Sequence, residues 1–86
     1  MKIYFHKKFQ KYFDKLQDGE QEKFRRRLEI FMEEEFNPVS NNHPLRGKYK
    51  GYRSINITGD LRAIYKRKSS QRVIFVIIGS HSNLYN

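Results

Sequence analysis

The sequence predicts an α+β fold in which an αα-hairpin packs on one face of an antiparallel sheet. Apolar residues recur with helical periodicity from residue 9 to residue 32, and strand-length apolar runs separated by turns follow residue 51. A strand-like run, Lys2–Phe5, opens the chain. The resulting order, β-α-α-β-β-β, keeps helices and strands in separate blocks, which is typical of α+β proteins. The 86 residues suffice for a single domain, residues 1–86, with one hydrophobic core.

Two amphipathic helices are predicted in the first half. Their apolar stripes are Phe9, Tyr12, Phe13 and Leu16, and then Phe24, Leu28, Phe31 and Met32. Asp18 and Gln21 have the spacing of a capping box that opens the second helix. On its outer side, i,i+4 ion pairs are expected for Glu22 with Arg26 and for Arg25 with Glu29. The acidic run 33–35 at its end opposes the helix dipole and has no local explanation, although contact with a basic partner would provide one.

Three strands are predicted in the second half. Pro38 ends the second helix, and residues 37–47 are expected to form a loop. The strands span Tyr52–Ile57, Leu61–Lys66 and Val73–Ile78, with turns at Thr58–Asp60 and Arg67–Gln71. The last strand is almost wholly apolar, so it is expected to be central and covered on both faces.

Side-chain alternation favours one register for the first two of these strands. A three-residue turn pairs Ile57 with Leu61, and it also pairs Asn56 with Arg62. One face then carries the apolar set Ile55, Ile57, Leu61, Ala63 and Tyr65, and the other carries Tyr52, Ser54, Asn56, Arg62, Ile64 and Lys66. The first face suits the helices. The second is expected to be an open, basic face with an aromatic residue, which suits RNA binding.

Positive charge is concentrated in the second half of the chain. The formal net charge is +9; residues 43–86 contain nine Lys or Arg residues and Asp60 as their only acid, a net of +8. Such a field attracts a polyanion, so nucleic acid or the ribosome is the expected partner, with an acidic protein as the alternative. No apolar run is long enough to span a membrane, no signal peptide is recognisable, and there is no cysteine. A cytoplasmic protein without a membrane partner is expected.

The remaining polar residues suit RNA cleavage without a metal. Such a reaction needs a base for the 2′-OH proton, cations for the phosphorane charge and an acid for the leaving 5′-oxygen. Histidine suits acid or base duty, and arginine forms a bidentate phosphate clamp. The candidates are His43, His81, Asp60, Arg62, Arg46 and Arg53. Each also has an ordinary structural explanation, such as a turn aspartate or a surface cation, and spacing alone leaves both explanations open. Tyr85 near the C-terminus is likewise explained as a packing residue.

Two motifs resemble the YafQ-like branch of the RelE/ParE toxin superfamily. The run HPLRGKYKGYRSINITGDLRAIY, residues 43–65, is similar to the HPLxGxxxGYR…xxD…xxIY signature of these toxins. Residues 78–85, IGSHSNLY, are similar to their closing GTHxxLF/Y motif. The N-terminal helices match only in type. The resemblance implies the RelE-like β-α-α-β-β-β fold.

The resemblance also implies residue roles. In similar toxins the closing histidine is the general acid, here His81, and the aspartate after the turn assists as base or by orienting a histidine, here Asp60. The opening histidine, here His43, is catalytic or positions RNA. An arginine that binds the scissile phosphate in other RelE-like toxins matches Arg62, although YafQ lacks it. Some YafQ-like toxins have a second-strand histidine where this chain has Asn56, so whether His43 or Asp60 is the base stays open.

The implied activity is that of an mRNA interferase, a ribosome-dependent endoribonuclease that needs no metal or other cofactor. The expected RNA-binding residues are Arg46, Lys48, Lys50, Arg53, Asn56 and Tyr85. The implied partners are the ribosome, mRNA and a cognate acidic antitoxin. The alternatives are a ParE-like non-catalytic toxin that binds DNA gyrase and an inactive RelE-fold binding module. The ParE-like class generally lacks the acid–base histidine, so His43 and His81 argue against it.

Overall fold

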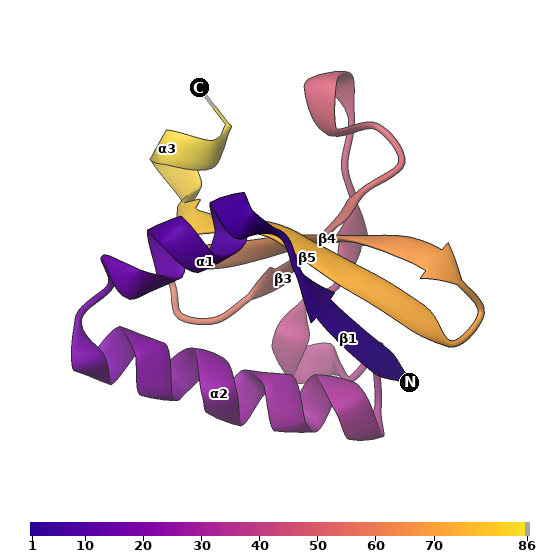
Figure 1. Cartoon of the computed structure of the whole chain (residues 1–86), viewed down its shortest axis with the longest axis horizontal. Coiled ribbons are helices and arrows are strands. Elements are labelled where there is room, and N and C mark those ends of the chain that lie inside the picture. Colours follow the sequence, from indigo (N-terminus) through magenta and orange to yellow (C-terminus); the bar gives the residue numbers. More distant parts are fainter. Residues whose placement is uncertain (86) are drawn as a thin grey trace.

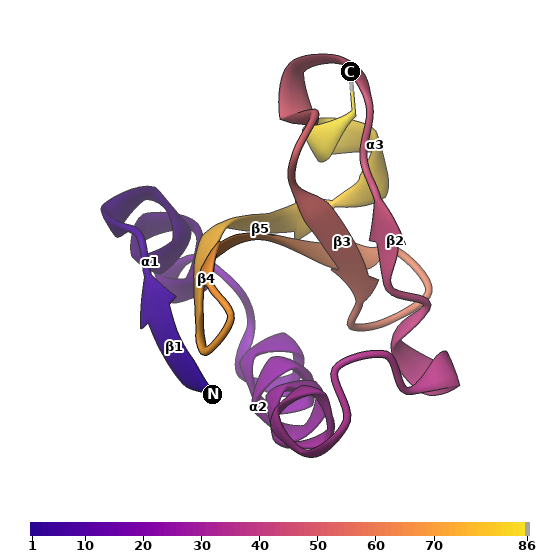
Figure 2. The same cartoon turned by 90° about the vertical axis from the view of Figure 1, so that its right-hand side faces the viewer.

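The computed structural model describes residues 1–85 and contains a five-stranded sheet of order β1-β5-β4-β3-β2 (Figure 1; all five strands are labelled in Figure 2). The strands are β1 (Lys2–Phe5), β2 (His43–Pro44), β3 (Arg53–Asn56), β4 (Leu61–Ser69) and β5 (Arg72–Ser80). The helices are α1 (Lys7–Asp14), α2 (Asp18–Glu33) and α3 (His81–Leu84), with 3-10 turns η1 (Pro38–Ser40) and η2 (Gly47–Tyr49). Side chains of α1 and α2 pack on the same face of the sheet, which confirms the predicted α+β fold. None of the helices in residues 1–85 is long and apolar enough to cross a membrane.

The sheet is antiparallel from β2 to β5, and β1 joins β5 in parallel at one edge. The parallel edge departs from the predicted antiparallel sheet: β1 pairs with the last strand and not with a neighbour in sequence. The strands β4 and β5 are longer than predicted, so the expected turn Arg67–Gln71 narrows to Ser70 and Gln71. The two-residue β2 lies inside the predicted loop, and α3 has four residues; both are too short for a periodic signal.

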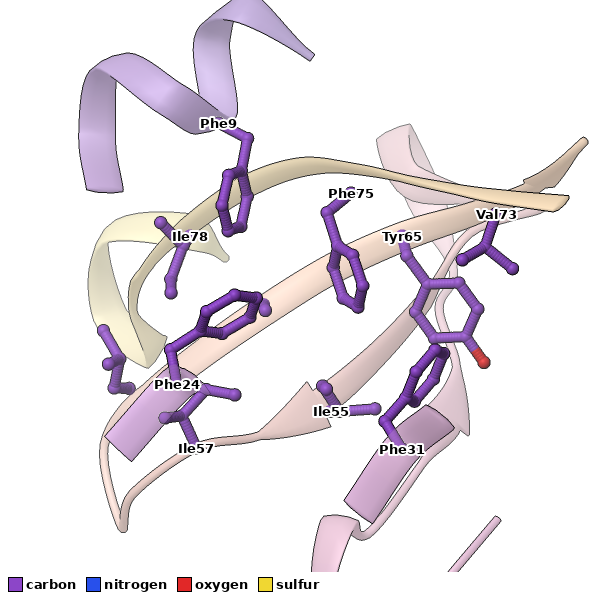
Figure 3. Close-up of a cluster of buried hydrophobic side chains, with 11 residues drawn as sticks. Phe9, Phe24, Phe31, Ile55, Ile57, Tyr65, Val73, Phe75 and Ile78 are labelled. Carbon is purple, nitrogen blue, oxygen red and sulfur yellow. The ribbon is translucent and has the colours of Figure 1, made fainter. Parts of the chain in front are cut away.

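The predicted register of β3 with β4 is confirmed. Asn56 pairs with Arg62, and the backbone N–H of Ile57 donates to Leu61 O at 2.8 Å. The apolar face created by this register forms the core with α1 and α2 (Figure 3). Phe75 lies at its centre, with ring centroids of Phe9, Phe24, Phe31 and Tyr65 at 5.9, 5.7, 5.5 and 5.4 Å. Tyr12 and Met32, which were expected in the apolar stripes, are exposed at their margins.

The start of α2 is shifted by one residue from its prediction. The capping box joins Gln17 and Glu20, not Asp18 and Gln21, because Gln17 is the last extended residue and Asp18 is already helical. Gln21 instead donates to Phe13 O at 2.9 Å and links the two helices. The Glu22–Arg26 pair forms as predicted, at 3.3 Å.

One predicted ion pair on α2 does not form. Arg25 lies 3.8 Å from Glu22 instead of pairing with Glu29, and its guanidinium lies over the Phe13 ring at 5.5 Å. The ring is on the neighbouring helix α1, so Arg25 covers the junction of the two helices. This contact buries part of the side-chain stem, which an exposed ion pair with Glu29 would not do.

A buried polar network explains part of the acidic run after α2. Tyr65 Oη donates to Glu35 Oε2 at 2.6 Å and accepts from Asn42 Nδ2 at 2.8 Å. Arg67 pairs with Glu35, and Arg53 Nε donates to Asn42 Oδ1 at 2.7 Å. Burial and the hydrogen bond to Glu35 raise the pKa of Tyr65 to about 12. Glu35 therefore binds basic and phenolic groups within the fold, without needing a partner protein.

The second face of the sheet is partly covered, in contrast to the expected open face. Ile64 and Ile77 are buried in a cluster with Leu84 of α3, and Leu45, Tyr49, Tyr52, Val76 and Tyr85 pack against it. The cover comes from α3 and from the loop between β2 and β3, residues 45–52. Figure 2 shows these two segments together above the sheet. The polar residues of this face consequently surround an apolar patch.

The Tyr65 network predicts an alkaline limit to stability. Tyr65→Phe leaves buried acceptor and donor groups of Glu35 and Asn42 without the hydroxyl, so unfolding by urea should show a loss of about 1–3 kcal/mol at pH 8. The folded-state pKa of Tyr65 is raised, so its contribution is complete below about pH 10, the unfolded value, and is lost as pH rises towards about 12. The stability gap between parent and variant should therefore shrink above pH 10; a constant gap from pH 8 to pH 11.5 would contradict this assignment.

Candidate functional site

The candidate site is built where β5 ends and α3 begins. Ser80 caps α3 by accepting a hydrogen bond from Asn83 N at 3.2 Å, and His81 is the first helical residue. Gly79, just before this junction, has no side chain. A Cβ at this position would lie only 3.2 Å from the Leu84 side chain. Glycine therefore permits the close approach of α3 to the strand that precedes it. The imidazole of His81 is exposed on a backbone that this packing holds in place.

The turn between β3 and β4 is joined to His81 by a backbone hydrogen bond. His81 N donates to Asp60 O at 2.8 Å. Thr58 Oγ1 accepts from Asp60 N at 3.2 Å and from Leu61 N at 2.9 Å, so the turn is also fixed internally. Asp60 is exposed, and the fold brings it next to the His81 backbone although the two residues are far apart in sequence.

Tyr85 links α3 to β3. Its ring centroid lies 4.8 Å from that of His81, and its hydroxyl donates to Ser54 Oγ at 2.9 Å. Ser54 is fully buried and is the strand partner of His43 in β2. Strand pairing therefore joins His43 to Ser54, and side-chain contacts join Ser54 through Tyr85 to His81. Tyr85 is both a packing residue of the second face and the connection between the two candidate histidines.

The hydrogen bonding of His43 defines its tautomer. Nδ1 lies 2.8 Å from the carbonyl oxygen of Asn41. A carbonyl can only accept, so Nδ1 carries the hydrogen, and in the neutral ring Nε2 keeps its lone pair. His43 is half-buried on the edge strand β2. Its geometry is that of a group able to accept a proton at Nε2.

Arg62 is held by the turn. Nη1 donates to Thr58 O at 2.9 Å and to Leu61 O at 3.3 Å, and Nη2 donates to Gly59 O at 3.0 Å. These bonds do not use Nε–H or the second hydrogen of Nη2, which can still reach an anion. Its strand partner Asn56 places Oδ1 in a buried position without a hydrogen-bond partner among residues 1–85. Arg62 was expected to bind phosphate, with a surface cation as the alternative, and the structure shows that it also braces the turn.

Two of the expected RNA-binding residues take different positions. Arg53 lies on the helix face, where it binds Asn42 and sits 5.1 Å from the Phe36 ring, so it does not join the histidines. Lys50 is exposed at the end of η2. Arg46 and Lys48, in contrast, line a hollow of about 380 Å³ with Tyr49, Leu84 and Tyr85. This hollow, named the Tyr85 hollow, brings cations of the loop to the C-terminal end of the site.

Some functional candidates have no signal in the sequence. Ser54 was assigned to the correct face by alternation, but its bond to Tyr85 joins residues 31 positions apart. Arg27 of α2 donates through Nη1 to Asn56 O, which fixes the end of β3 from the far side.

Within residues 1–85, no three His, Asp or Glu side chains gather in an arrangement that could hold a metal ion.

Comparisons with known structures give the same architecture. YafQ from E. coli has a TM-score of 0.82 at 23% identity, with 98% of this chain and 97% of that chain covered. The YoeB/ParE toxin from Agrobacterium tumefaciens has a TM-score of 0.76 at 24% identity, with 94% and 99% covered. YafQ in the E. coli DinJ–YafQ toxin–antitoxin complex has a TM-score of 0.79 at 24% identity, with 98% and 96% covered. These likenesses establish the fold.

The remaining comparisons identify the family. A copper-bound mutant toxin from Helicobacter pylori is 30% identical with a TM-score of 0.73, and 99% of each chain is covered. No curated protein sequence matches the chain. A family model described as the bacterial toxin of type II toxin–antitoxin systems, YafQ, matches residues 1–86. The chain therefore belongs to the YafQ family of bacterial toxins.

Proposed function

We propose that the chain is an endoribonuclease toxin that cuts mRNA on the ribosome in the cytoplasm. The observation that supports this proposal is the connection from His43 to His81, which runs through the strand pairing of His43 with Ser54 and the side-chain contacts of Tyr85 with Ser54 and His81. A ParE-like gyrase poison or an inactive binding module would not need these groups to be held together. The net charge of +8 in residues 43–86 supports binding to ribosomal and messenger RNA.

The proposed reaction is an attack of the 2′-oxygen on the adjacent phosphorus. His43 Nε2, left basic by the bond from Nδ1 to Asn41 O, accepts the 2′-OH proton. The P–O5′ bond breaks to give a 2′,3′-cyclic phosphate, and protonated His81 gives its proton to the leaving 5′-oxygen. The unused N–H groups of Arg62 stabilise the charge on the phosphorane. Asp60, whose backbone oxygen accepts from His81 N, assists by orienting the segment that carries the general acid.

The proposed regulator is a cognate antitoxin. The solved complex of YafQ with DinJ concerns a relative of the same fold, and we extend only the existence of an antitoxin to this chain. An acidic antitoxin fits the charge of residues 43–86 and would compete with RNA for the same face.

His81 is the sharpest test of the nuclease proposal. His81→Ala should reduce single-turnover mRNA cleavage by about 10²–10⁴-fold and abolish growth arrest, because a positioned acid is lost. His81→Gln should be equally inactive, since an amide cannot donate a full proton near neutral pH. Ribosome and antitoxin binding should stay close to those of the parent. A folded His81→Ala protein that still arrests growth would rule out the nuclease proposal and favour a binding toxin.

The Ser54–Tyr85 bond should position His81 rather than merely stabilise the fold. Ser54→Ala and Tyr85→Phe should each lower the maximal cleavage rate several-fold, and the double variant should be no worse than either single variant. The double-mutant cycle should give a coupling of about 0.5–3 kcal/mol in the activation free energy. Ser40→Ala is the matched control, because Ser40 is equally buried and its Oγ has no hydrogen-bond partner among the described residues. Additive losses would show that the bond does not act on catalysis.

Arg62 should contribute to both stability and catalysis. Arg62→Ala removes three hydrogen bonds to the turn and should lower the free energy of unfolding by about 1–3 kcal/mol, which a free surface cation would not do. Cleavage should fall further than the loss of folded protein explains. Arg62→Lys should rescue little of either property, since lysine lacks the planar fork. Urea unfolding and single-turnover cleavage, measured on the same samples, separate the two effects.

A further inference from the structure

A second hollow on the site face is not used by the proposed reaction. It has a volume of about 250 Å³ and lies between the start of α1 and the loop 45–52. It is lined by His6, the N-cap of α1, by Lys8 of α1, by Lys48, Tyr49 and Tyr52, and by Val76 and Ile77 of β5. We name it the Lys8 hollow. Its charged lining residues are all cations, and it has aromatic and aliphatic surfaces.

Each tyrosine ring of the Lys8 hollow has one lysine ammonium group near its face. Tyr49 and Tyr52 pack edge to face with ring centroids 6.0 Å apart. Lys48 Nζ lies 5.2 Å from the Tyr49 centroid, and Lys66 Nζ lies 5.4 Å from that of Tyr52. Exposed lysines combined with aromatic faces are the components that bind single-stranded nucleic acid, where the cations contact phosphate and the rings stack on bases.

The wall formed by the loop 45–52 is rigid. Tyr52 N donates to Tyr49 O at 2.9 Å, Lys50 N donates to Gly47 O at 3.0 Å, and Leu45 N donates to Tyr52 O at 2.9 Å. Gly47 and Gly51 adopt φ values of 66° and 91°, which only glycine accommodates readily. The tyrosines are therefore presented in a fixed position, so little conformational entropy is lost when a ligand binds.

Lys8 is not placed for the stability of its helix. It lies in the first turn of α1, where the helix dipole disfavours a cation, and this turn contains no acid. His6, which lines the hollow, accepts at Nδ1 from Lys8 N at 3.0 Å, so the neutral ring carries its hydrogen on Nε2. An anion in the hollow would offset the unfavourable position of Lys8 and accept from His6 Nε2–H.

We propose that the Lys8 hollow binds a nucleotide of the substrate RNA next to the cleavage site. This inference rests on the proposed function. It is carried by the wall that two hollows share: Lys48 and Tyr49 line both the Lys8 hollow and the Tyr85 hollow. An RNA strand whose scissile phosphate lies at His81 passes Tyr85 and then the shared wall of Lys48 and Tyr49 before it enters the Lys8 hollow. The phosphate contacts Lys8 and Lys48, and the base packs on Tyr52.

The first test uses RNA that cannot be cut, so it does not depend on nuclease activity. Fully 2′-O-methylated oligoribonucleotides are titrated into the purified protein, and binding is followed by fluorescence anisotropy over a range of salt concentrations. Lys8→Ala should weaken binding about fivefold at roughly 0.1 M salt and reduce the salt slope by about 0.7, the value for one lost phosphate contact on a single strand. Tyr52→Leu, which keeps apolar packing but cannot stack, should weaken binding by about tenfold.

Lys11→Ala is the matched control, since it removes the same charge from α1 at a residue outside the lining of the hollow. It should change affinity by less than about twofold and leave the salt slope unchanged. Equal effects of Lys8→Ala and Lys11→Ala would overturn the proposal, because they would show that Lys8 contributes only to the overall surface charge. Circular dichroism checks that the variants fold alike; Lys8→Ala is expected to be at least as helical as the parent.

The second test separates substrate RNA from ribosomal RNA. Lys8→Ala should weaken binding to ribosomes programmed with mRNA but leave binding to vacant ribosomes unchanged, and in cleavage assays it should raise KM about fivefold at constant kcat. Equal weakening on vacant ribosomes would assign the hollow to ribosomal RNA and overturn the proposal. If the parent fails to cut programmed ribosomes, the proposed nuclease function fails, whereas the oligonucleotide titration still decides whether the hollow binds RNA.

Discussion

The pairing of β3 with β4 is the constraint on which both the core and the site depend. Successive side chains on a strand point to opposite faces, so a slip of one residue would exchange the two faces completely. The observed register places Ile55 and Ala63 under the helices and leaves Ser54, Asn56 and Arg62 on the opposite side. The same pairing sets the three-residue turn, and that turn carries Asp60 to the backbone of His81. The aromatic core and the polar site are two results of one register.

The candidate site combines side chains that are fixed by burial or hydrogen bonds with side chains that are exposed at the surface. Its anchors are buried or bonded: Ser54 has no exposed surface, and the guanidinium of Arg62 is attached to the turn. The candidate proton-transfer groups lie at the surface, where His81 is exposed and His43 is half-buried. Preorganised groups around an accessible reaction centre lose little energy to rearrangement when charge develops. The apolar patch of Ile64, Ile77 and Leu84 supplies the rigidity beneath them.

The sequence predicted the parts of this fold that repeat with a period. Helical stripes and strand alternation located the helices, the register and the apolar face, and the two motifs identified the candidate histidines. The same alternation already separates Arg53 from Ser54, so the assignment of Arg53 to the RNA face conflicted with the predicted register. The parallel edge, the cover by α3 and the Tyr85–Ser54 bond could not be predicted, because they depend on contacts between distant segments with no local pattern.

The parallel pairing of β1 with β5 has a consequence for the order in which the protein folds. Lys2 is the partner of Arg72, so the first strand must find residues seventy positions away, and closing such a loop is slow in comparison with forming helices and hairpins. A growing polypeptide has α1 and α2 complete long before Phe75, the ring that their phenylalanines surround, has been added. Until then both helices expose apolar stripes without a partner. The chain consequently folds late in its synthesis, and the face with the candidate site, which depends on the end of β5, is among the last parts to form.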